Sequence, residues 1–353
     1  MRILGIESSC DETAAAVVEE TGDEAKPWVV RSSVVASQVE IHREWGGVVP
    51  ELASRQHLRD ICGVVERAMA ESETRPGDLG AIAVTQGPGL VGSLLVGLSF
   101  AKSLAAVWDL PLVPVHHLAG HIESLFLQHG PLPLPAIILV VSGGHTSLYE
   151  VRQPGRYDAL GRTRDDAAGE AYDKVAKLLG LGYPGGPIID RLARNGDDRA
   201  MAFPVARMTH PDRNAPLQKG QWDFSFSGLK TSVLRHVKAR GAGWTPSTKE
   251  IADLCASFQR SVVEALVDKT LAAARWYGAS SIGIAGGVSA NSRLRADAQA
   301  AGERIGVPVF VPSLALSTDN AAMIAAAGLR RFHAGVRAGL DLNADASLRL
   351  EYP

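Results

Sequence analysis

Residues 136–151 read Ala-Ile-Ile-Leu-Val-Val-Ser-Gly-Gly-His-Thr-Ser-Leu-Tyr-Glu-Val. The apolar run Ala136 to Val141 predicts a buried strand, and Thr146 to Val151 predict a second strand that returns beside it. The residues between them, Ser142 to His145, are of the small and polar kinds that tight turns favour. This stretch therefore predicts a β-hairpin with a hydroxyl and free backbone amides at its tip.

The first residues of the chain follow the same plan. Residues 2–7 predict a buried strand, residues 8–12 a polar turn and residues 13–18 a returning strand. Two hairpins of one design indicate an internal duplication, and hence an α/β fold in two halves. We expect both tips to face a common cleft, where their hydroxyls and amides suit a polyphosphate or an adenylate.

Length and composition fit this division. The chain has 353 residues, of which 46% are hydrophobic and 21% are charged. This composition is typical of a globular protein that buries a large core. We expect an N-terminal lobe over 1–134 and a C-terminal lobe over 135–330. The C-terminal lobe is expected to carry insertions over about 150–250, with the Asp319 loop returning to the cleft, and 331–353 to form a peripheral tail.

Charge and targeting signals narrow the class of protein. With a net charge of −2, binding of a nucleic acid requires a local basic patch or a second protein that carries one. Glu7 comes too early for a signal peptide, and no uninterrupted apolar run reaches membrane-spanning length. We therefore expect a cytoplasmic protein with no membrane partner.

The best local basic surface lies among prolines and glycines in residues 196–226, although a solvated loop is the favoured interpretation. Its basic residues are Arg199, Arg207, His210, Arg213 and Lys219.

Three scattered cysteines, Cys10, Cys62 and Cys255, form no Cys-x-x-Cys pair, which argues against a disulfide framework and a zinc knuckle. Cys10 beside Asp11 is interpreted as a small residue in a turn rather than a nucleophile, because no histidine partner is evident nearby.

A metal site is indicated where the apolar run Leu112 to Val115 ends. If a helix begins at His117, then His117 and His121 stand four positions apart on one helical face. Asp319, in a loop before the small-residue helix 321–329, offers a third ligand. Two imidazoles and one carboxylate suit Fe(II) or Zn(II). A pair of structural histidines at a helix start explains the spacing equally well.

Two familiar motifs are incomplete. A His-Glu-x-x-His zinc protease needs Glu directly after the first histidine, where this chain has Leu118. The glycine-rich stretch 86–93 suggests a P-loop, but Leu98 follows Gly97 where Lys is required. Glycines that let a helix start pack closely or approach a ligand are the favoured interpretation.

Two further helix starts carry polar residues. A Gly-Gly turn after the predicted strand 281–285 leads into a capped helix and places Asn291 at the carboxyl edge of the sheet. Residues 224–231 predict a helix start with a hydroxyl cap.

Nine motifs, in order over residues 2 to about 330, closely resemble the bacterial tRNA N6-adenosine threonylcarbamoyltransferase family. They are Gly5 to Thr13, Gly46 to Glu51, Gln86 to Gly89, His116 to His121, Val141 to Thr146, Asp165 to Lys174, Ser225 to Thr231, Gly286 to Asn291 and Ser317 to Asn320. One motif alone is unspecific, whereas nine in order are highly specific.

The resemblance implies a two-lobed actin/hexokinase/Hsp-type ATPase fold, with duplicated ribonuclease-H-like domains around a nucleotide cleft. It implies transfer of a threonylcarbamoyl group from threonylcarbamoyl-AMP to N6 of the adenosine next to the anticodon, in tRNAs reading codons that begin with A. It also implies work with a smaller paralogue of the same fold (TsaB-type) and a P-loop ATPase (TsaE-type).

Carried over residue by residue, the resemblance implies a metal, usually iron, on His117, His121 and Asp319. Fe(II) is expected, with Zn(II) or Mg(II) as alternatives. It implies an adenylate site made of Val140, Val141, Ser142, Gly143, Gly144, Asp173, Gly186, Asp190 and Asn291. Asp173 and Asp190 suit the ribose or the threonyl part, and Asn291 the nucleoside. Asp11 or Glu12 is the candidate for orienting N6 or accepting its proton.

Three other functions remain open from the sequence. A metallopeptidase is disfavoured by Leu118. A kinase or carbamoyltransferase of the same fold would share the hairpin tips, and a nucleotide-sensing scaffold would bind adenylate without turnover.

Overall fold

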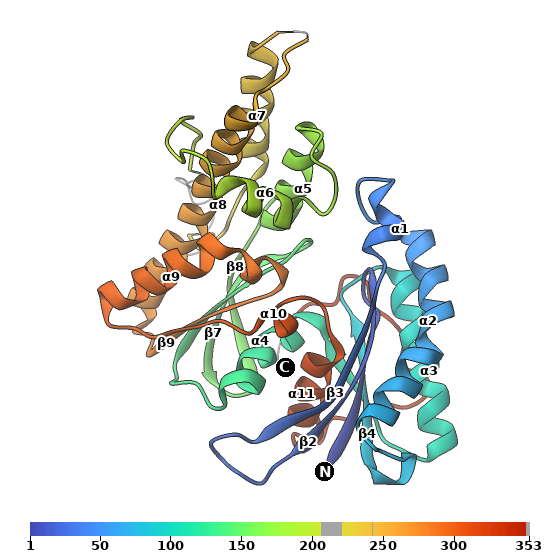
Figure 1. Ribbon diagram of the computed structural model, residues 1–353. Coiled ribbons are helices and arrows are strands. Elements are labelled where there is room, and N and C mark those ends of the chain that lie inside the picture. Colours follow the sequence, from blue (N-terminus) through green and yellow to red (C-terminus); the bar gives the residue numbers. More distant parts are fainter. Residues whose placement is uncertain (206–220, 242, 351–353) are drawn as a thin grey trace, which may run out of the picture. The chain divides into compact units, whose positions relative to one another are not determined.

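Two five-stranded sheets form the framework of this computed structural model, which describes residues 1–205, 221–241 and 243–350 (Figure 1). The first sheet contains β1 (Arg2–Glu7), β2 (Glu12–Glu20), β3 (Trp28–Ser37), β4 (Leu79–Gly87) and β5 (Leu112–His116). The second contains β6 (Ala136–Val141), β7 (Thr146–Gln153), β8 (Arg156–Arg162), β9 (Ser281–Ala285) and β10 (Val309–Phe310).

Both sheets have the same topology. The first has the strand order β3-β2-β1-β4-β5, and the second has the corresponding order β8-β7-β6-β9-β10. β1 runs antiparallel to β2 and parallel to β4, as β6 does to β7 and β9. The duplication predicted from the two hairpins is therefore confirmed.

Contacts divide the chain into two compact units. Unit 1 contains Met1–Leu132, the β7–β8 turn Gln153–Tyr157 and the chain from Pro312 onward, and unit 2 contains Pro133–Arg152 and Asp158–Val311. The expected boundary near residue 134 lies close to the observed one. Residues 312–330, expected in the C-terminal lobe, instead belong to unit 1, because the helix they contain packs on the first sheet.

Helices cover both faces of the first sheet. They are α1 (Val39–Arg43), α2 (Pro50–Glu71), α3 (Val91–Trp108), α4 (His117–His129), α10 (Leu314–Ser317) and α11 (Ala321–His333), with a short 3-10 turn at Pro76–Asp78. In β1, Leu4 and Ile6 pack toward α2 and α3, while Gly5 faces α11. Burial on both faces explains why β1 and β4 are continuously apolar in sequence.

Small residues let α11 approach its neighbours closely. A methyl group added at Gly5 would lie 2.4 Å from the carbonyl oxygen of Ala321, and one added at Gly120 on α4 would lie 2.8 Å from Ile324. Because α11 supplies mostly alanines here, its backbone packs directly on β1 and α4. This packing fixes the loop that precedes α11, which holds Asp319.

The second sheet shares its core with a further set of helices. They are α5 (Ala168–Leu178), α6 (Gly185–Ala193), α7 (Ser227–Ala239), α8 (Thr248–Tyr277) and α9 (Ser292–Ile305), with a 3-10 turn at Gly287–Ala290. The core of unit 2 joins β6 and β9 to α8, through side chains such as Leu139, Ile284, Val262 and Leu266.

Two details differ from the predictions. β8 had no prediction, because Arg156–Arg162 alternates polar and apolar residues only weakly. α7 has no side-chain cap of its own, contrary to the predicted hydroxyl cap. The carboxylate of Asp165 instead accepts the backbone N–H of Phe226 and Ser227, together with the hydroxyls of Ser225 and Ser227.

The tail after residue 330 was expected to be peripheral, but hydrogen bonds join it to the first sheet. α11 continues to His333, and the amide of Ala338 donates to the carbonyl of Leu112 on β5, over 2.9 Å. Further on, the amide of Asp345 donates to the carbonyl of Gln86 on β4, over 3.0 Å. The C-terminal segment is therefore tied to the first sheet.

One helix among the described residues, α3, is long and apolar enough to span a membrane by length and composition alone. A count of uninterrupted apolar runs misses it, because Lys102 and three serines break the run. Leu98 and Ala101 of α3 are buried in the core that α2 and α3 share with the first sheet, and Leu94 is also completely buried. Since 33% of the helix is buried, its apolar character is used only in part for this packing.

A buried ion pair joins α4 to α11. Glu123 is completely buried, and its carboxylate accepts two hydrogen bonds from the guanidinium of Arg330, at 2.6 and 2.7 Å. The hydroxyl of Tyr157 also donates to Glu123. Arg330 lies over the rings of Trp28 and Phe126, at 4.8 and 5.2 Å from the ring centres. Such bidentate pairs fix orientation as well as distance.

We predict that Arg330→Ala lowers the free energy of unfolding by about 3 kcal/mol, because it leaves the buried carboxylate of Glu123 without its charged partner. Chemical denaturation measures this loss. The matched control is Arg331→Ala, which removes the same side chain from the next position of α11 and should cost less than about 1 kcal/mol. Equal losses in the two variants would contradict a special role for the Glu123 pair.

Candidate functional site

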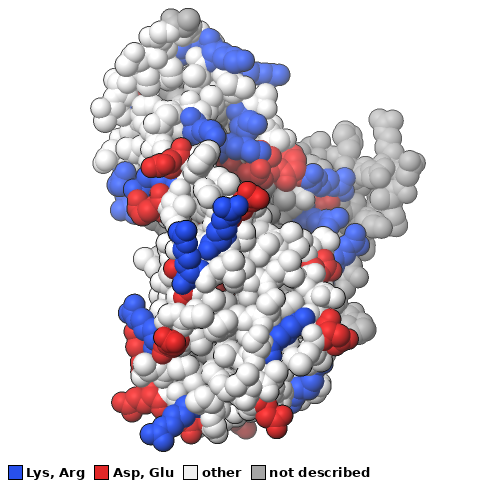
Figure 2. Space-filling view, turned by 90° about the vertical axis from the view of Figure 1, so that its right-hand side faces the viewer, with Lys and Arg blue, Asp and Glu red and all other residues white. Residues whose placement is uncertain are grey.

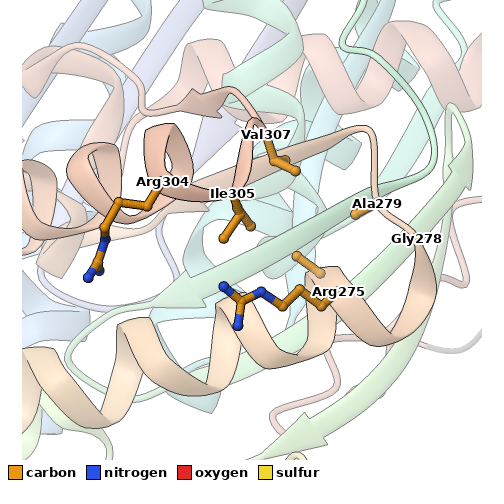
Figure 3. A pocket seen from close by; sticks show the side chains of 7 residues that line it. Arg275, Gly278, Ala279, Arg304, Ile305 and Val307 are labelled. Atoms are coloured by element: carbon orange, nitrogen blue, oxygen red, sulfur yellow. The ribbon is translucent and has the colours of Figure 1, made fainter.

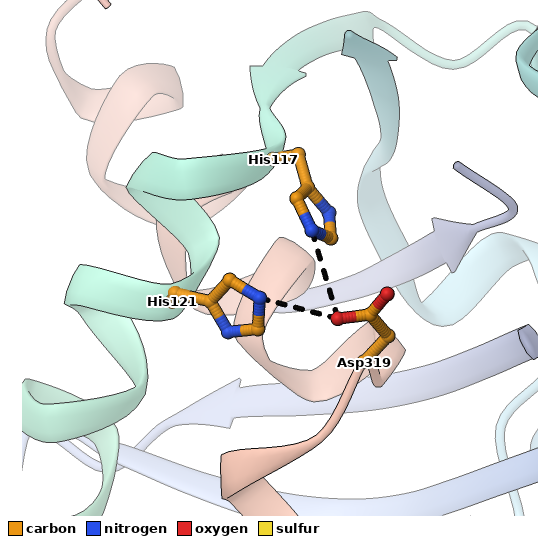
Figure 4. Close-up of side chains that lie close together, drawn as sticks. All are labelled: His117, His121 and Asp319. Atoms are coloured by element: carbon orange, nitrogen blue, oxygen red, sulfur yellow. Dashed lines mark ion pairs between the residues drawn. The ribbon is translucent and has the colours of Figure 1, made fainter. Parts of the chain in front are cut away.

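His117, His121 and Asp319 meet in unit 1, as the sequence predicted (Figure 4). One ligand atom from each lies within 4.8 Å of the other two. The Nε2 atoms of His117 and His121 lie 3.6 and 3.1 Å from Oδ1 of Asp319. α4 begins at His117, so both imidazoles project from its first turns. Asn320 caps α11 by accepting the amide of Met323 and thereby fixes the turn that carries Asp319.

The surroundings of His121 fit a metal ligand better than a structural histidine. Its side chain is completely buried, yet neither ring nitrogen has a hydrogen-bond partner. A buried polar atom without a partner is costly, so a structural histidine normally has one. Nε2 of His121 instead faces the carboxylate of Asp319 and the ring of His117, with 4.8 Å between the two ring centres. Two imidazoles and a carboxylate are a donor set for Fe(II) or Zn(II), whereas Mg(II) prefers oxygen ligands.

Glu7 completes the environment of His117, although the sequence analysis did not select it. Its carboxylate lies at the end of β1, is completely buried, and approaches Nδ1 of His117 at 3.1 Å. Thr85 donates a hydrogen bond to Glu7 over 2.7 Å, and the amide of Ser9 donates one over 2.5 Å. A carboxylate at Nδ1 holds the proton there and leaves Nε2 free for a ligand. The sequence feature that could have identified Glu7 is a carboxylate at the end of an otherwise apolar strand.

Electrostatics in this cluster follow from burial and opposite charges. Burial alone would lower the pKa of His117, but Asp319 and Glu7 outweigh it and raise the value to about 9. For Glu7, burial opposes ionisation, yet His117 holds the pKa below its usual value. The cluster is thus a buried negative environment in which a cation is stabilised.

The acidic hairpin tip lies in the same unit. Burial, followed by the charges of Asp11 and Asp319, raises the pKa of Glu12 well above its usual value. The same influences raise the pKa of Cys10, so its thiol stays protonated, as expected for a cysteine that is not a nucleophile. A carboxylic acid with a raised pKa stays protonated to higher pH than an exposed one.

Buried histidines hold this tip in place. His57 on α2 contacts the hydroxyl of Thr13 at 2.7 Å and the carbonyl of Cys10 at 2.9 Å. Burial lowers the pKa of His57, so the neutral ring is favoured. The amide of Gln38 donates to the carbonyl of Asp11 over 3.0 Å. The backbone on both sides of Asp11 is therefore fixed.

In unit 2, the second hairpin tip presents backbone rather than side chains. Val140 and Val141 are completely buried in β6, so only their backbone is available to a ligand. The amide of Gly169, at the start of α5, donates to the carbonyl of Ser142 over 3.2 Å. Gly143 and Gly144 are exposed, and a methyl group at either would touch nothing. The turn and the start of α5 form a cradle of amides that suits an anion.

Asp190 and Asn291 are joined by a residue that the sequence analysis missed, Gln259. Its side-chain amide donates to Asp190 over 3.1 Å and accepts from Asn291 over 2.9 Å. Asn291 also caps α9 by accepting the amide of Leu294. Gln259 is buried in the long helix α8. The sequence of a helix does not show whether a buried polar residue belongs to a site or only to the packing, so Gln259 was not selected.

Asp173 lies on α5 and is hydrogen-bonded to the start of α6, where Gly186 lies. The carboxylate of Asp173, on α5, accepts the amide of Gly185 over 2.7 Å. Gly286, at φ +91°, turns the chain after β9 so closely that a methyl group there would lie 2.5 Å from the carbonyl of Val141. The predicted adenylate residues therefore gather around the carboxyl ends of β6 and β9, while the predicted metal and catalytic residues gather in unit 1.

A hollow in unit 2 does not contain these groups. It measures about 490 Å³ and lies at the ends of α8 and α9 (Figure 3). Ala274, Gly278, Ala279, Ile305 and Val307 line it together with Arg275 and Arg304. The two arginines lie in the last turns of their helices, where they complement the helix dipole. No carboxylate, hydroxyl or imidazole among its lining residues offers catalytic chemistry.

The predicted basic patch lies mostly outside the described residues. Positive and negative side chains are interspersed on the face drawn in Figure 2. Arg199 is exposed, but Arg207, His210, Arg213 and Lys219 lie outside the described residues.

Comparisons with known proteins show the family of this chain. A sequence profile for "tRNA N6-adenosine threonylcarbamoyltransferase" (TsaD) matches residues 29–326. Proteins of that name from Anaeromyxobacter sp. (strain Fw109-5) and Anaeromyxobacter dehalogenans (strain 2CP-1) are 54% and 55% identical, over 99% of this chain and 100% and 99% of theirs. The one from Koribacter versatilis is 50% identical, over 99% of this chain and 98% of its own.

Solved structures support the fold alone. HypF from T. kodakarensis superposes with a TM-score of 0.61 at 14% identity, over 95% of this chain and 48% of that one. Full-length HypF in a phosphate- and nucleotide-bound form gives 0.57 at 12% identity, over 93% and 55%. These are proteins of the actin-like ATPase fold, as the resemblance implied. With full-length relatives at this identity, the chain belongs to the tRNA N6-adenosine threonylcarbamoyltransferase family of enzymes.

Proposed function

We propose that this protein transfers the threonylcarbamoyl group from threonylcarbamoyl-AMP to N6 of the adenosine next to the anticodon, in tRNAs reading codons that begin with A. The observation that carries the proposal is the buried set of His117, His121 and Asp319, in the same unit as the acidic tip, in a chain whose full-length relatives bear this name.

The chemistry requires an activated acyl donor. N6 of adenosine is a poor nucleophile because its lone pair is conjugated with the ring. In the proposed reaction N6 attacks the carbamoyl carbon, the bond from that carbon to the phosphate oxygen breaks, AMP leaves, and N6 loses one proton. A bound Fe(II) would supply a Lewis acid that stabilises charge developing on oxygen, with Zn(II) as the alternative that the same ligands support.

Within this scheme the protein's own groups have distinct tasks. His117, His121 and Asp319 hold the metal, and Glu7 orients His117. Asp11 or Glu12 orients N6 or accepts its proton, and the raised pKa of Glu12 supports an exchange of protons there. Because Leu118 stands where a zinc protease has its Glu, peptide hydrolysis remains disfavoured.

The adenylate is assigned to unit 2. The backbone amides of Gly143 and Gly144 and the hydroxyl of Ser142 suit its phosphate. Asp173 and Asp190 suit its ribose or threonyl part, and Gly186 is a further member of the site. Asn291 is assigned to the nucleoside, although both ends of its amide already have protein partners. Val140 and Val141 would contribute backbone only, since their side chains are buried.

Partners complete the proposal. A smaller paralogue of the same fold (TsaB-type) and a P-loop ATPase (TsaE-type) are the expected partners, and the cytoplasm is the expected location. The net charge of −2 supports shared rather than solitary binding of tRNA.

The central prediction is tested by reconstitution with threonine, bicarbonate, ATP, unmodified tRNA, the separate synthase that makes the adenylate and the two partner proteins. We expect threonylcarbamoyladenosine in the digested tRNA, measured by nucleoside mass spectrometry, and loss of at least about 100-fold with His121→Ala, since a catalytic metal contributes several kcal/mol. Exposed His129→Ala on the same helix is the control and should keep activity. Full activity of His121→Ala would remove the metal from the mechanism.

Glu7→Gln should weaken metal binding about tenfold without unfolding the protein, because Gln keeps the shape but loses the charge that orients His117. Competition with a chromophoric chelator measures the affinity for Zn(II). Glu66→Gln, an exposed carboxylate on α2, is the control. If both variants bind Zn(II) as the unchanged protein does, Glu7 has no part in the centre.

Gln259→Leu should weaken binding of AMP about tenfold, because Asp190 and Asn291 lose the amide that orients them both. Calorimetric titration with AMP measures this, and thermal unfolding shows whether the fold is intact. Gln299→Leu makes the same replacement at an exposed position of α9 and should leave the affinity unchanged. Unaltered AMP affinity in Gln259→Leu would assign Gln259 to packing alone.

A further inference from the structure

The C-terminal segment 338–350, here called the strap, runs along the ends of β4 and β5. The amide of Ala338 bonds to Leu112, that of Asp345 to Gln86, and the carbonyl of Ala346 accepts the amide of Gly89 over 3.3 Å. The side chain of Gln86 also donates to the carbonyl of Asn343, over 3.2 Å. Backbone pairing at both ends gives the strap a defined position.

The strap is packed as well as hydrogen-bonded. Leu342 and Ala344 contact the apolar core that α2 and α3 share with the first sheet. At Gly87, a methyl group would lie only 1.9 Å from the carbonyl oxygen of Asp345, so that only glycine allows this approach. A segment seated this closely is part of unit 1 rather than a loose end.

Near its end the strap contacts His116, the residue before the first candidate metal ligand. Nδ1 of His116 accepts the amide of Leu118 over 3.1 Å and thereby caps α4. Since Nδ1 is the acceptor, the proton of the neutral ring lies on Nε2, which donates to the carbonyl of Leu348 over 3.0 Å. One imidazole therefore joins the strap to the first turn of α4.

This connection reaches the metal ligands through the helix start. His117 is the first residue of α4 and His121 lies one turn later, so their spacing exists only while the first turn is formed. A cap stabilises that turn, and the carbonyl of Leu348 selects the ring tautomer that can cap. We propose that His116 and the strap form a positioning device for the metal centre, in which docking of the strap and binding of metal favour each other.

The inference rests on the metal centre of the proposed function, but not on the transfer reaction. If docking of the strap raises the affinity for metal, then metal must raise the stability of the docked strap by the same factor. The amides of Gly89 and Asp345, which bond between the strap and β4, report docking by hydrogen exchange.

The experiment uses the full chain, Zn(II) as the probe and two substitutions. His116→Asn keeps an acceptor for the cap but cannot reach Leu348, and His116→Ala loses both bonds. We expect Zn(II) affinity to fall about threefold in His116→Asn and about tenfold in His116→Ala, on the scale of a lost cap. We expect Zn(II) to slow exchange at Gly89 and Asp345 in the unchanged protein, and to have no effect there in either variant.

Controls separate positioning from general stability and from failure of the centre. Ser247→Ala removes a comparable cap from α8 in unit 2 and should lower the melting temperature without changing Zn(II) affinity. The inference is overturned, while the centre stands, if both His116 variants bind Zn(II) as tightly as the unchanged protein. It is also overturned if Zn(II) never alters hydrogen exchange at Gly89 and Asp345. Zn(II) binding that His121→Ala does not weaken would refute the centre itself, and the inference with it.

Discussion

The contact of α11 with α4 and the first sheet is the constraint on which the rest of unit 1 depends. At Gly5 and Gly120 the packing leaves no room for a side chain, and the buried pair of Glu123 and Arg330 fixes the two helices further along. Because α4 carries two ligands and the loop before α11 carries the third, the same contact sets the geometry of the candidate metal centre. The interface between α11 and α4 therefore stabilises the fold and also positions the candidate ligands.

Charged groups in unit 1 also orient the side chains of the candidate centre. Glu7 holds one side of His117 while its other side faces Asp319, so the candidate cation site lies between one buried and one partly exposed carboxylate. The acidic tip is close enough for Asp319 to influence Glu12, and His57 keeps the tip rigid. The arrangement places Glu12, a candidate for proton transfer, in the same unit as the candidate cation site.

Much of this could be predicted from the sequence, and the exceptions have physical reasons. β6 and β9 were placed to the residue, because buried strands are continuous apolar runs with polar turns at their ends. His117, His121 and Asp319 were found through the helical spacing and the resemblance. Glu7, Gln259 and the cap from Asp165 were missed because each acts on a distant segment, and one sequence does not show which segments meet. β8 and the strap were missed because neither has a clear hydrophobic period.

The crossing of α11 from the end of the second sheet to the first has a consequence for how the protein is made. On the ribosome the histidine pair emerges some two hundred residues before its carboxylate partner, 319 minus 117 being 202. Throughout that interval one face of the first sheet lacks its covering helix, so early folding of the leading half is incomplete. All three candidate ligands are present only when translation is nearly finished, and a polypeptide interrupted before Asp319 lacks the third.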